Sequence, residues 1–367
     1  MRIKSCLYFL GLSCLPIFLL SLLNIFYSIY FDYSENIKSY FIVLLSSLII
    51  GFIFFKIGQK FKDNITIYEQ IFLVILIYFF IPIFFSIPFY LSDYNLTFTN
   101  SYFESISGLT GTGFSIISDI TNLDPPLILW RSSSQWVGGF YFLIFLILIF
   151  SNKQIDKKFI NYSFNLENKL NFASNLHTAS IKIFFIYFIL TIFIFSIFSI
   201  SGIRLFNSFN LSMTIISSGG FLPFNNIDLI INSDFKKIIF SILMLFSYFS
   251  LFLIYNIFFL KEKKIRFFAE DIYLLIYFLT LLVIFFIFFN FDYNFSNVLF
   301  SLTSSMSNIG ISLRDTPSNL WFLFLIVVII GGSFFSTSSG IRLLKIYFLF
   351  KHSLNEILSY SRPNNVY

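Results

Sequence analysis

Long runs of apolar residues alternate with short polar segments along the whole chain. A run of about 20 apolar residues is long enough to cross the hydrocarbon core of a bilayer as an α-helix. Read in this way, the pattern predicts an all-α polytopic membrane protein with eight transmembrane spans. Their approximate bounds are residues 7–30, 40–55, 68–90, 127–150, 181–200, 238–260, 272–289 and 320–350, the last one interrupted by a glycine- and serine-rich stretch.

Three of the polar segments share one design. Each has a Ser/Thr-rich stretch, then a glycine, then one large apolar residue, and each lies between two apolar runs; the segments are residues 103–115, 213–221 and 304–312. A design that recurs at corresponding places is an internal repeat. We therefore predict an N-terminal two-helix hairpin over residues 1–65, followed by three helix–loop–helix repeats over residues 66–160, 161–266 and 267–367.

The three segments are too short and too polar to cross a bilayer, so we expect them to enter the membrane and return as half-helices. Irregular backbone at membrane depth is tolerated where it is buried in protein or lines a watery cavity. The C-terminal end of a half-helix carries partial negative charge, which favours a cation. The backbone carbonyls beyond that end can replace the hydration shell of an ion, and glycine supplies the backbone angles that a β-carbon forbids. We therefore predict three re-entrant, K+-channel-like pore loops with an ion filter formed by Thr110, Gly111, Thr112, Gly113, Ser218, Gly219, Gly220, Ser307, Asn308, Ile309 and Gly310.

Composition supports the membrane class and argues against an enzyme. Hydrophobic residues make up 57% of the chain, charged residues 11%, and the mean hydropathy is +0.84. Such values are typical of polytopic membrane proteins. The chain has two histidines, and its sequence shows no HExxH, paired-Asp or Ser/Lys arrangement. We therefore predict no catalytic residues and no bound cofactor.

The basic residues indicate the orientation, because cytoplasmic loops of membrane proteins carry an excess of Lys and Arg. With the N-terminus inside, both termini are cytoplasmic and the three loops open outward. The outside then keeps six of the 24 Lys and Arg residues: Lys38, Arg131, Arg204, Lys236, Lys237 and Arg314. The net charge of +6 is therefore interpreted as a topology signal and not as a nucleic-acid surface. Arg342 and Lys345 are expected to serve this rule, or else to repel cations at the inner mouth.

Several residues beside the loops are predicted to support them. Glu104 is expected to anchor the first half-helix by hydrogen bonds. The alternative is that its negative charge draws cations toward the filter. Arg131 is expected to snorkel to the interface or to pair with a carboxylate. Gly138 and Gly139 are expected to let helices pack closely, because small residues are common between membrane helices.

These segments resemble the signatures of a known family. Residues 103–113 (FESISGLTGTG) are similar to the FExxSGLTTTG of the TrkH/KtrB potassium-transport family (Trk/Ktr/HKT). Arg131 with residues 135–139 is close to the family's R…QWxGG, and residues 218–221 stand in place of its xGGF. Residues 331–342 resemble the family's GGCxGSTGGGIK, an intramembrane gate loop, with fewer glycines and with Phe334 and Phe335 added. The resemblance covers nearly the whole chain.

The resemblance implies potassium as the transported ion, bound by backbone oxygens of Thr110, Gly113, Gly220 and Gly310. Glycine at the filter positions favours potassium over sodium by analogy with the family. The implied gate loop consists of Ser333, Phe334, Phe335, Ser336, Thr337, Ser338, Ser339 and Gly340. Further implications are a multi-pass location in the bacterial inner membrane among its lipids, a homodimer, and a cytoplasmic nucleotide-binding regulatory partner of the TrkA/KtrA kind.

One departure from the family leaves alternatives open. The family has four repeats around one pore, whereas this sequence shows three, and a wall left open to lipid would be costly. Three alternatives stay open for the missing quarter: a separate fourth-repeat chain, loss through a frameshift, or replacement by a partner. The alternatives to potassium transport are a truncated, non-conducting remnant and a membrane scaffold of the same fold.

Overall fold

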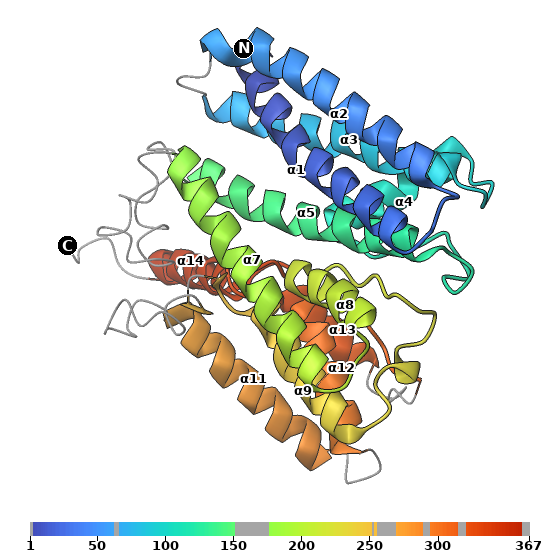
Figure 1. Cartoon of the computed structure of the whole chain (residues 1–367). Helices are drawn as coiled ribbons and strands as arrows, with labels where there is room; N and C mark the ends of the chain where they lie inside the picture. The colour runs from blue at the N-terminus through green and yellow to red at the C-terminus, as the bar shows by residue number, and fades with distance from the viewer. Residues whose placement is uncertain are drawn as a thin grey trace. The chain divides into compact units, whose positions relative to one another are not determined.

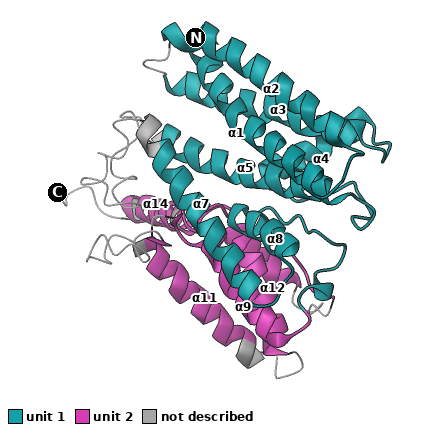
Figure 2. Cartoon of the chain, in the orientation of Figure 1, with its two compact units in different colours: residues 1–156, 170–231 teal, residues 157–169, 232–367 magenta. Residues whose placement is uncertain are grey.

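The computed structural model describes residues 3–61, 66–150, 176–251, 253–254, 269–288, 294–314 and 321–361 (Figure 1). The regular secondary structure of these residues is helical, which confirms the predicted all-α class. The chain divides into two compact units (Figure 2). Unit 1 comprises residues 1–156 and 170–231, and unit 2 comprises residues 157–169 and 232–367.

Unit 1 contains the N-terminal hairpin and the first two of the three polar segments, residues 103–115 and 213–221. We call the three of them, with residues 304–312, the pore segments. The helices of unit 1 are α1 (Ile3–Tyr30), α2 (Ile37–Gly58), α3 (Ile67–Leu91), α4 (Phe98–Thr110), α5 (Pro125–Phe150), α7 (Leu176–Ile200) and α8 (Leu205–Ser217), with short 3-10 turns η1 (Gln59–Phe61) and η4 (Ile227–Leu229). Helices α1 and α2 pack backbone to backbone, since a β-carbon on Gly11 would lie 2.7 Å from the Gly51 carbonyl oxygen. Small residues permit this close approach of membrane helices.

Unit 2 contains the third pore segment and the gate loop, which we define as residues 333–340. Its helices are α9 (Asp234–Tyr248), α11 (Ala269–Phe288), α12 (Phe295–Ser307), α13 (Trp321–Ile330) and α14 (Leu343–Ser361). A buried apolar cluster fills its interior, with Tyr248, Leu274, Leu302 and Met306 among its members. Burial of this apolar surface holds the helices of the unit together.

Four helical segments of the described part are long and apolar enough to cross a membrane. They are Ile3–Tyr30, Ile37–Phe61, Ile67–Leu91 and Ser180–Ile200, and Trp321–Ile330 is a shorter apolar helix. Many large apolar side chains on these helices are exposed, including Leu19, Phe26, Phe52 and Phe79. Exposed apolar faces of this extent mark a membrane or protein contact. The total of eight spans stays a prediction.

The sixth apolar run differs from the sequence prediction. We predicted a continuous span over residues 238–260, but α9 ends at Tyr248, and Phe249 has an extended backbone with ψ at 162°. The cause is the gate loop, whose Ser338 and Ser333 backbone N–H groups donate to the carbonyl oxygens of Ser247 (3.1 Å) and Tyr248 (2.9 Å). A segment that inserts into the helical hydrogen-bond ladder ends or kinks a helix.

Candidate functional site

The three pore segments have one backbone geometry. Helices α4, α8 and α12 each contain 13 residues. Each ends at a residue in the left-handed conformation: Gly111 (φ 68°), Ser218 (φ 55°) and Asn308 (φ 58°). In each, the N–H of the following residue donates to the carbonyl five residues back, at 3.1, 3.0 and 3.2 Å for Thr112, Gly219 and Ile309. A bond from the residue after the cap to the carbonyl five residues back is typical of a Schellman-type helix end.

A second left-handed position follows two residues after each cap. It is occupied by Gly113 (φ 77°), Gly220 (φ 83°) and Gly310 (φ 76°). The chain then reverses, because a hydroxyl in the last turn of the helix donates to the carbonyl oxygen seven residues later. The pairs are Ser107 to Phe114 (2.5 Å), Thr214 to Phe221 (2.8 Å) and Ser304 to Ile311 (2.6 Å). The positive φ at this second position explains why glycine occupies it in all three loops.

This common geometry aligns the three loops residue by residue and adds one position to the sequence prediction. Thr110, Ser217 and Ser307 are equivalent, and each side chain donates to the carbonyl four residues back. Ser217 was missed because the second segment was numbered from its double glycine. Counting three residues back from Gly220, as from Gly113 and Gly310, would have found it. We therefore define the first, second and third filter loops as residues 110–113, 217–220 and 307–310.

The first and second filter loops lie side by side in unit 1. A β-carbon on Gly113 would lie 2.6 Å from the carbonyl oxygen of Gly219, and one on Gly111 would lie 3.8 Å from the carbonyl oxygens of Ser217 and Ser218. Residues about 100 positions apart in sequence are thus brought together at this point. Their carbonyl groups can serve one ion, as in filters built from backbone oxygens. The third filter loop has the same internal geometry within unit 2.

Helix α5 holds both of these loops. A β-carbon on Gly138 would overlap the carbonyl oxygen of Leu109, and one on Gly139 would lie 2.9 Å from Cβ of Ser217. Gln135 from the same helix donates from Nε2 to the Gly219 carbonyl (2.5 Å) and accepts at Oε1 from the Phe221 N–H (3.1 Å). The glycines therefore pack helices closely, as expected, and one lone pair of the Gly219 carbonyl is already occupied.

Replacing Gln135 with leucine is expected to destabilise the protein by about 1–3 kcal/mol, because the second filter loop loses both bonds and keeps unpaired polar groups. Thermal unfolding of the full chain in detergent measures this change. Gln59→Leu, on an exposed residue of η1, is the matched control and is expected to leave the melting temperature unchanged. Equal melting temperatures for both variants would contradict the assigned role of Gln135.

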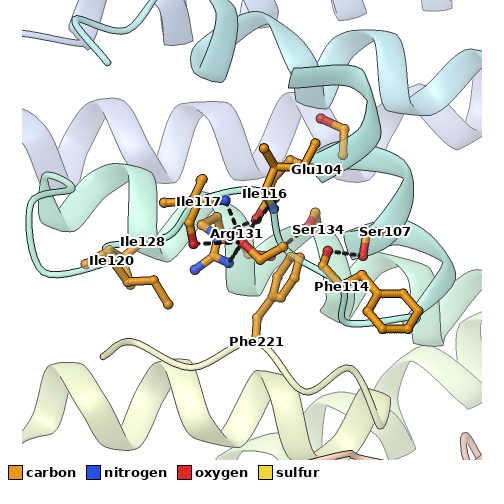
Figure 3. Close-up of polar contacts among 12 residues, drawn as sticks. Glu104, Ser107, Phe114, Ile116, Ile117, Ile120, Ile128, Arg131, Ser134 and Phe221 are labelled. Atoms are coloured by element: carbon orange, nitrogen blue, oxygen red, sulfur yellow. Dashed lines mark hydrogen bonds and ion pairs between the residues drawn. The ribbon is translucent and has the colours of Figure 1, made fainter. Parts of the chain in front are cut away.

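A buried ion pair joins α4 to α5 beside the return segment of the first loop, residues 114–124 (Figure 3). Glu104 and Arg131 approach to 2.9 Å, and each side chain is 1% exposed. Glu104 also accepts from the Ser115 hydroxyl (2.9 Å) and the Ile116 N–H (3.0 Å). The guanidinium of Arg131 stacks 4.3 Å above the ring of Phe221 in the second segment. The structure therefore favours the anchoring role of Glu104, and Arg131 pairs with a carboxylate.

Asp119 joins the segments that follow the first two filter loops, residues 114–124 and 221–233. Its carboxylate accepts from the Asn225 amide (2.7 Å) and from the Thr121 hydroxyl (2.5 Å). The bonds from Thr121 and Asn225 lower the pKa of Asp119. A carboxylate with a lowered pKa stays ionised at neutral pH, so Asp119 is a negative charge that can raise the local concentration of cations.

The gate loop is an internally bonded segment between α13 and α14, buried over residues 333–336 and exposed at residues 339 and 340. Glu270 at the start of α11 accepts from the Phe334 N–H (3.0 Å) and the Ser333 hydroxyl (3.4 Å). Phe334 and Phe335 are buried, and the Phe335 carbonyl accepts from the Leu251 N–H at 3.0 Å. Bulky side chains here are therefore accommodated in the interior of unit 2.

The structure adds a contact that the expectations for Arg342 did not include. Its side chain is buried. It donates to the Ser333 carbonyl oxygen and to the Ser336 hydroxyl (2.7 Å), which cross-links the gate loop. Arg342 itself adopts the left-handed conformation (φ 76°) just after the loop. Such a backbone is uncommon for a bulky residue.

Comparisons with known proteins agree with this geometry. The chain is 26% identical over 285 residues to an uncharacterized cation transporter of Methanocaldococcus jannaschii, which covers 76% of this chain and 58% of that protein. It is 23% identical over 283 residues to the Trk system potassium uptake protein TrkH of Halomonas elongata, covering 73% and 58%. It is 25% identical over 291 residues to the Trk system potassium uptake protein TrkG of Escherichia coli, covering 74% and 59%. No protein-family model matches the chain.

A solved structure has the same fold. The potassium transporter TrkH from Vibrio parahaemolyticus superposes with a TM-score of 0.83 at 20% identity, covering 100% of this chain and 78% of that one. Against the three sequence relatives, the chain spans less than two thirds of their length. These matches confirm the resemblance to the Trk proteins that the motifs indicated. The relatives are transporters by name, in agreement with the prediction that the chain is not an enzyme.

Proposed function

We propose that this chain, as a relative of the Trk potassium uptake proteins, forms the ion-conducting part of a potassium transport system. The observation that carries the proposal is the repeated geometry of the filter loops. Three pore helices end in the same pair of left-handed positions, and each is closed by the same hydroxyl-to-carbonyl bond. A non-conducting remnant or a scaffold would not need this geometry to recur.

In this proposal, potassium loses its hydration water to backbone carbonyls of the filter loops. The ligands include the oxygens of Thr110, Gly113, Gly220 and Gly310, and the residues equivalent to Thr110 add Ser217 and Ser307. Carbonyl dipoles can replace the hydration shell of potassium. The partial negative charge at the C-terminal ends of α4, α8 and α12 attracts the ion to this level. The ion then passes the gate loop, which opens and closes the path.

The proposed setting is the bacterial inner membrane. The chain would cross it eight times, with three re-entrant loops and with both termini in the cytoplasm. The proposed partners are a second copy of the chain, a regulatory subunit of the TrkA/KtrA kind, and a fourth repeat supplied by a further polypeptide segment. The exposed apolar faces of α1 to α3 would contact lipid, which agrees with the exposure of Leu19, Phe52 and Phe79.

Rubidium uptake in a bacterial strain without its own potassium transporters tests the proposal. We expect uptake from cells that express the chain, alone or with a co-expressed fourth repeat from a Trk protein. Potassium is expected to compete with rubidium more strongly than sodium does. Uptake no higher than that of cells with empty vector, from protein shown to be inserted, would contradict the proposal in favour of the remnant or scaffold.

A further inference from the structure

The C-terminal end of α13, just before the gate loop, has an unusual source of hydrogen bonds. The last four carbonyls of a helix have no partner within it unless the following residues supply one. At this end, the carbonyls of Val327, Ile329 and Ile330 accept from the N–H groups of Gly331 (3.3 Å), Ile341 (2.9 Å) and Arg342 (2.9 Å). The remaining carbonyl, that of Val328, accepts from the Asn308 side-chain amide at 3.2 Å.

The same amide also reaches the gate loop. Asn308 Nδ2 donates to the Ser339 hydroxyl at 2.8 Å. Gly332 cannot serve Val328 as the next helical donor, because its N–H is directed to the Ser338 hydroxyl at 3.0 Å. A side chain of the third filter loop therefore completes the end of α13 and holds the last part of the gate loop.

This link distinguishes the third loop from its two equivalents. Asn308 is the left-handed cap of α12, and the corresponding caps are Gly111 and Ser218. Gly111 has no side chain, and the Ser218 hydroxyl has no hydrogen-bond partner within the described residues. The backbone of Asn308 is also part of the predicted filter. One residue thus takes part in the filter loop through its backbone and in the gate-loop contact through its side chain.

We propose that Asn308 is a positioning residue that couples the gate loop to the third filter loop. Displacing the gate loop breaks the bond to Ser339 and leaves the Asn308 amide held by the Val328 carbonyl alone. By linkage, a cation bound at the carbonyls of this loop then stabilises the gate loop in place, and a displaced gate loop weakens cation binding. The cation half of this inference rests on the proposed function, whereas the hydrogen-bonded link does not.

Hydrogen exchange of the full chain in detergent, read by mass spectrometry, tests the coupling. The variants are Asn308→Gly, which keeps the left-handed backbone and removes the amide, and Ser339→Ala. Asn95→Gly is the matched control, since Asn95 is also left-handed (φ 53°) and lies in the loop between α3 and α4, outside the filter loops. Each protein is measured in potassium chloride and in N-methylglucamine chloride at equal ionic strength.

Without potassium, Asn308→Gly is expected to speed exchange in residues 331–342 on the order of tenfold through the loss of two hydrogen bonds. Ser339→Ala should give a smaller increase and Asn95→Gly none. With potassium, exchange of the gate loop should slow in the wild-type chain but not in Asn308→Gly, while residues 110–113 stay protected by potassium in both. A structural defect alone would not remove this potassium response selectively.

Two results separate the hypotheses. If Asn308→Gly exchanges its gate loop like the wild type, or if potassium still slows it there, the coupling is overturned while the transport proposal stands. If potassium slows exchange of the filter loops in no protein, the proposed cation site fails. The potassium part of the coupling fails with it, and the potassium-free comparison then decides the hydrogen-bonded link alone.

Discussion

Gly113→Ala is expected to reduce rubidium uptake at least about tenfold, because the alanine is both strained and obstructed. Residue 113 has φ at 77°, and its β-carbon would lie 2.6 Å from the Gly219 carbonyl oxygen. The left-handed conformation costs an L-residue about 1–2 kcal/mol. The contact also forces apart two filter loops whose carbonyls must keep a common spacing around the ion. Uptake per inserted protein and the competition by potassium and sodium measure the effect.

Gly202→Ala is the matched control. Gly202 also has a positive φ, at 80°, but nothing lies within 4 Å of its added β-carbon, and it stands in the loop after α7. This variant carries the same backbone strain away from the filter, so we expect wild-type uptake. Gly310→Ala combines φ at 76° with open space and should have an intermediate effect. If Gly113→Ala and Gly202→Ala transported equally well, the first filter loop would not be part of the ion path.

The sequence was informative where the chemistry is local. Glycine at 113, 220 and 310 is required by the backbone of its own segment, so the repeat could be seen without coordinates. Ser217 was missed although its signal is local, because the register of the second loop depends on the helix end and not on the double glycine. The two bonds of Gln135 join residues 84 and 86 positions apart. The order of apolar and polar residues around Gln135 does not indicate which residues it bonds.

Elsewhere the structure differs from the prediction because distant segments decide the local structure. The run over residues 238–260 is largely apolar, and apolarity favours a continuous helix. Helix α9 nevertheless ends at Tyr248, where the gate loop donates its amides from residues 333 and 338. Arg342 was likewise interpreted by its charge, although burial among the carbonyl and hydroxyl groups of Ser333 and Ser336 determines its role. Contacts between residues so far apart in the sequence leave no periodic residue pattern from which they could be inferred.

Arg131→Met is expected to cause the largest loss of stability, about 3–5 kcal/mol in the free energy of unfolding. The substitution leaves Glu104 buried at 1% exposure without its counter-charge. Breaking a buried pair by removing one partner is costly because it leaves an uncompensated charge. The stacking of Arg131 on Phe221 at 4.3 Å is lost as well, so the second segment should loosen together with the first. Thermal unfolding of the full chain in detergent measures this loss.

The double variant Glu104→Gln with Arg131→Met distinguishes charge from packing. A neutral glutamine can still accept from the Ile116 N–H, so we expect the double variant to be more stable than Arg131→Met alone. A double-mutant cycle then gives a coupling energy for the pair. Arg204→Met, at an exposed arginine before α8, controls for the loss of a positive charge and should change stability little. Strictly additive effects of the two substitutions would show that Glu104 and Arg131 act independently, and the ion pair would then not be what holds the first pore helix against its return segment.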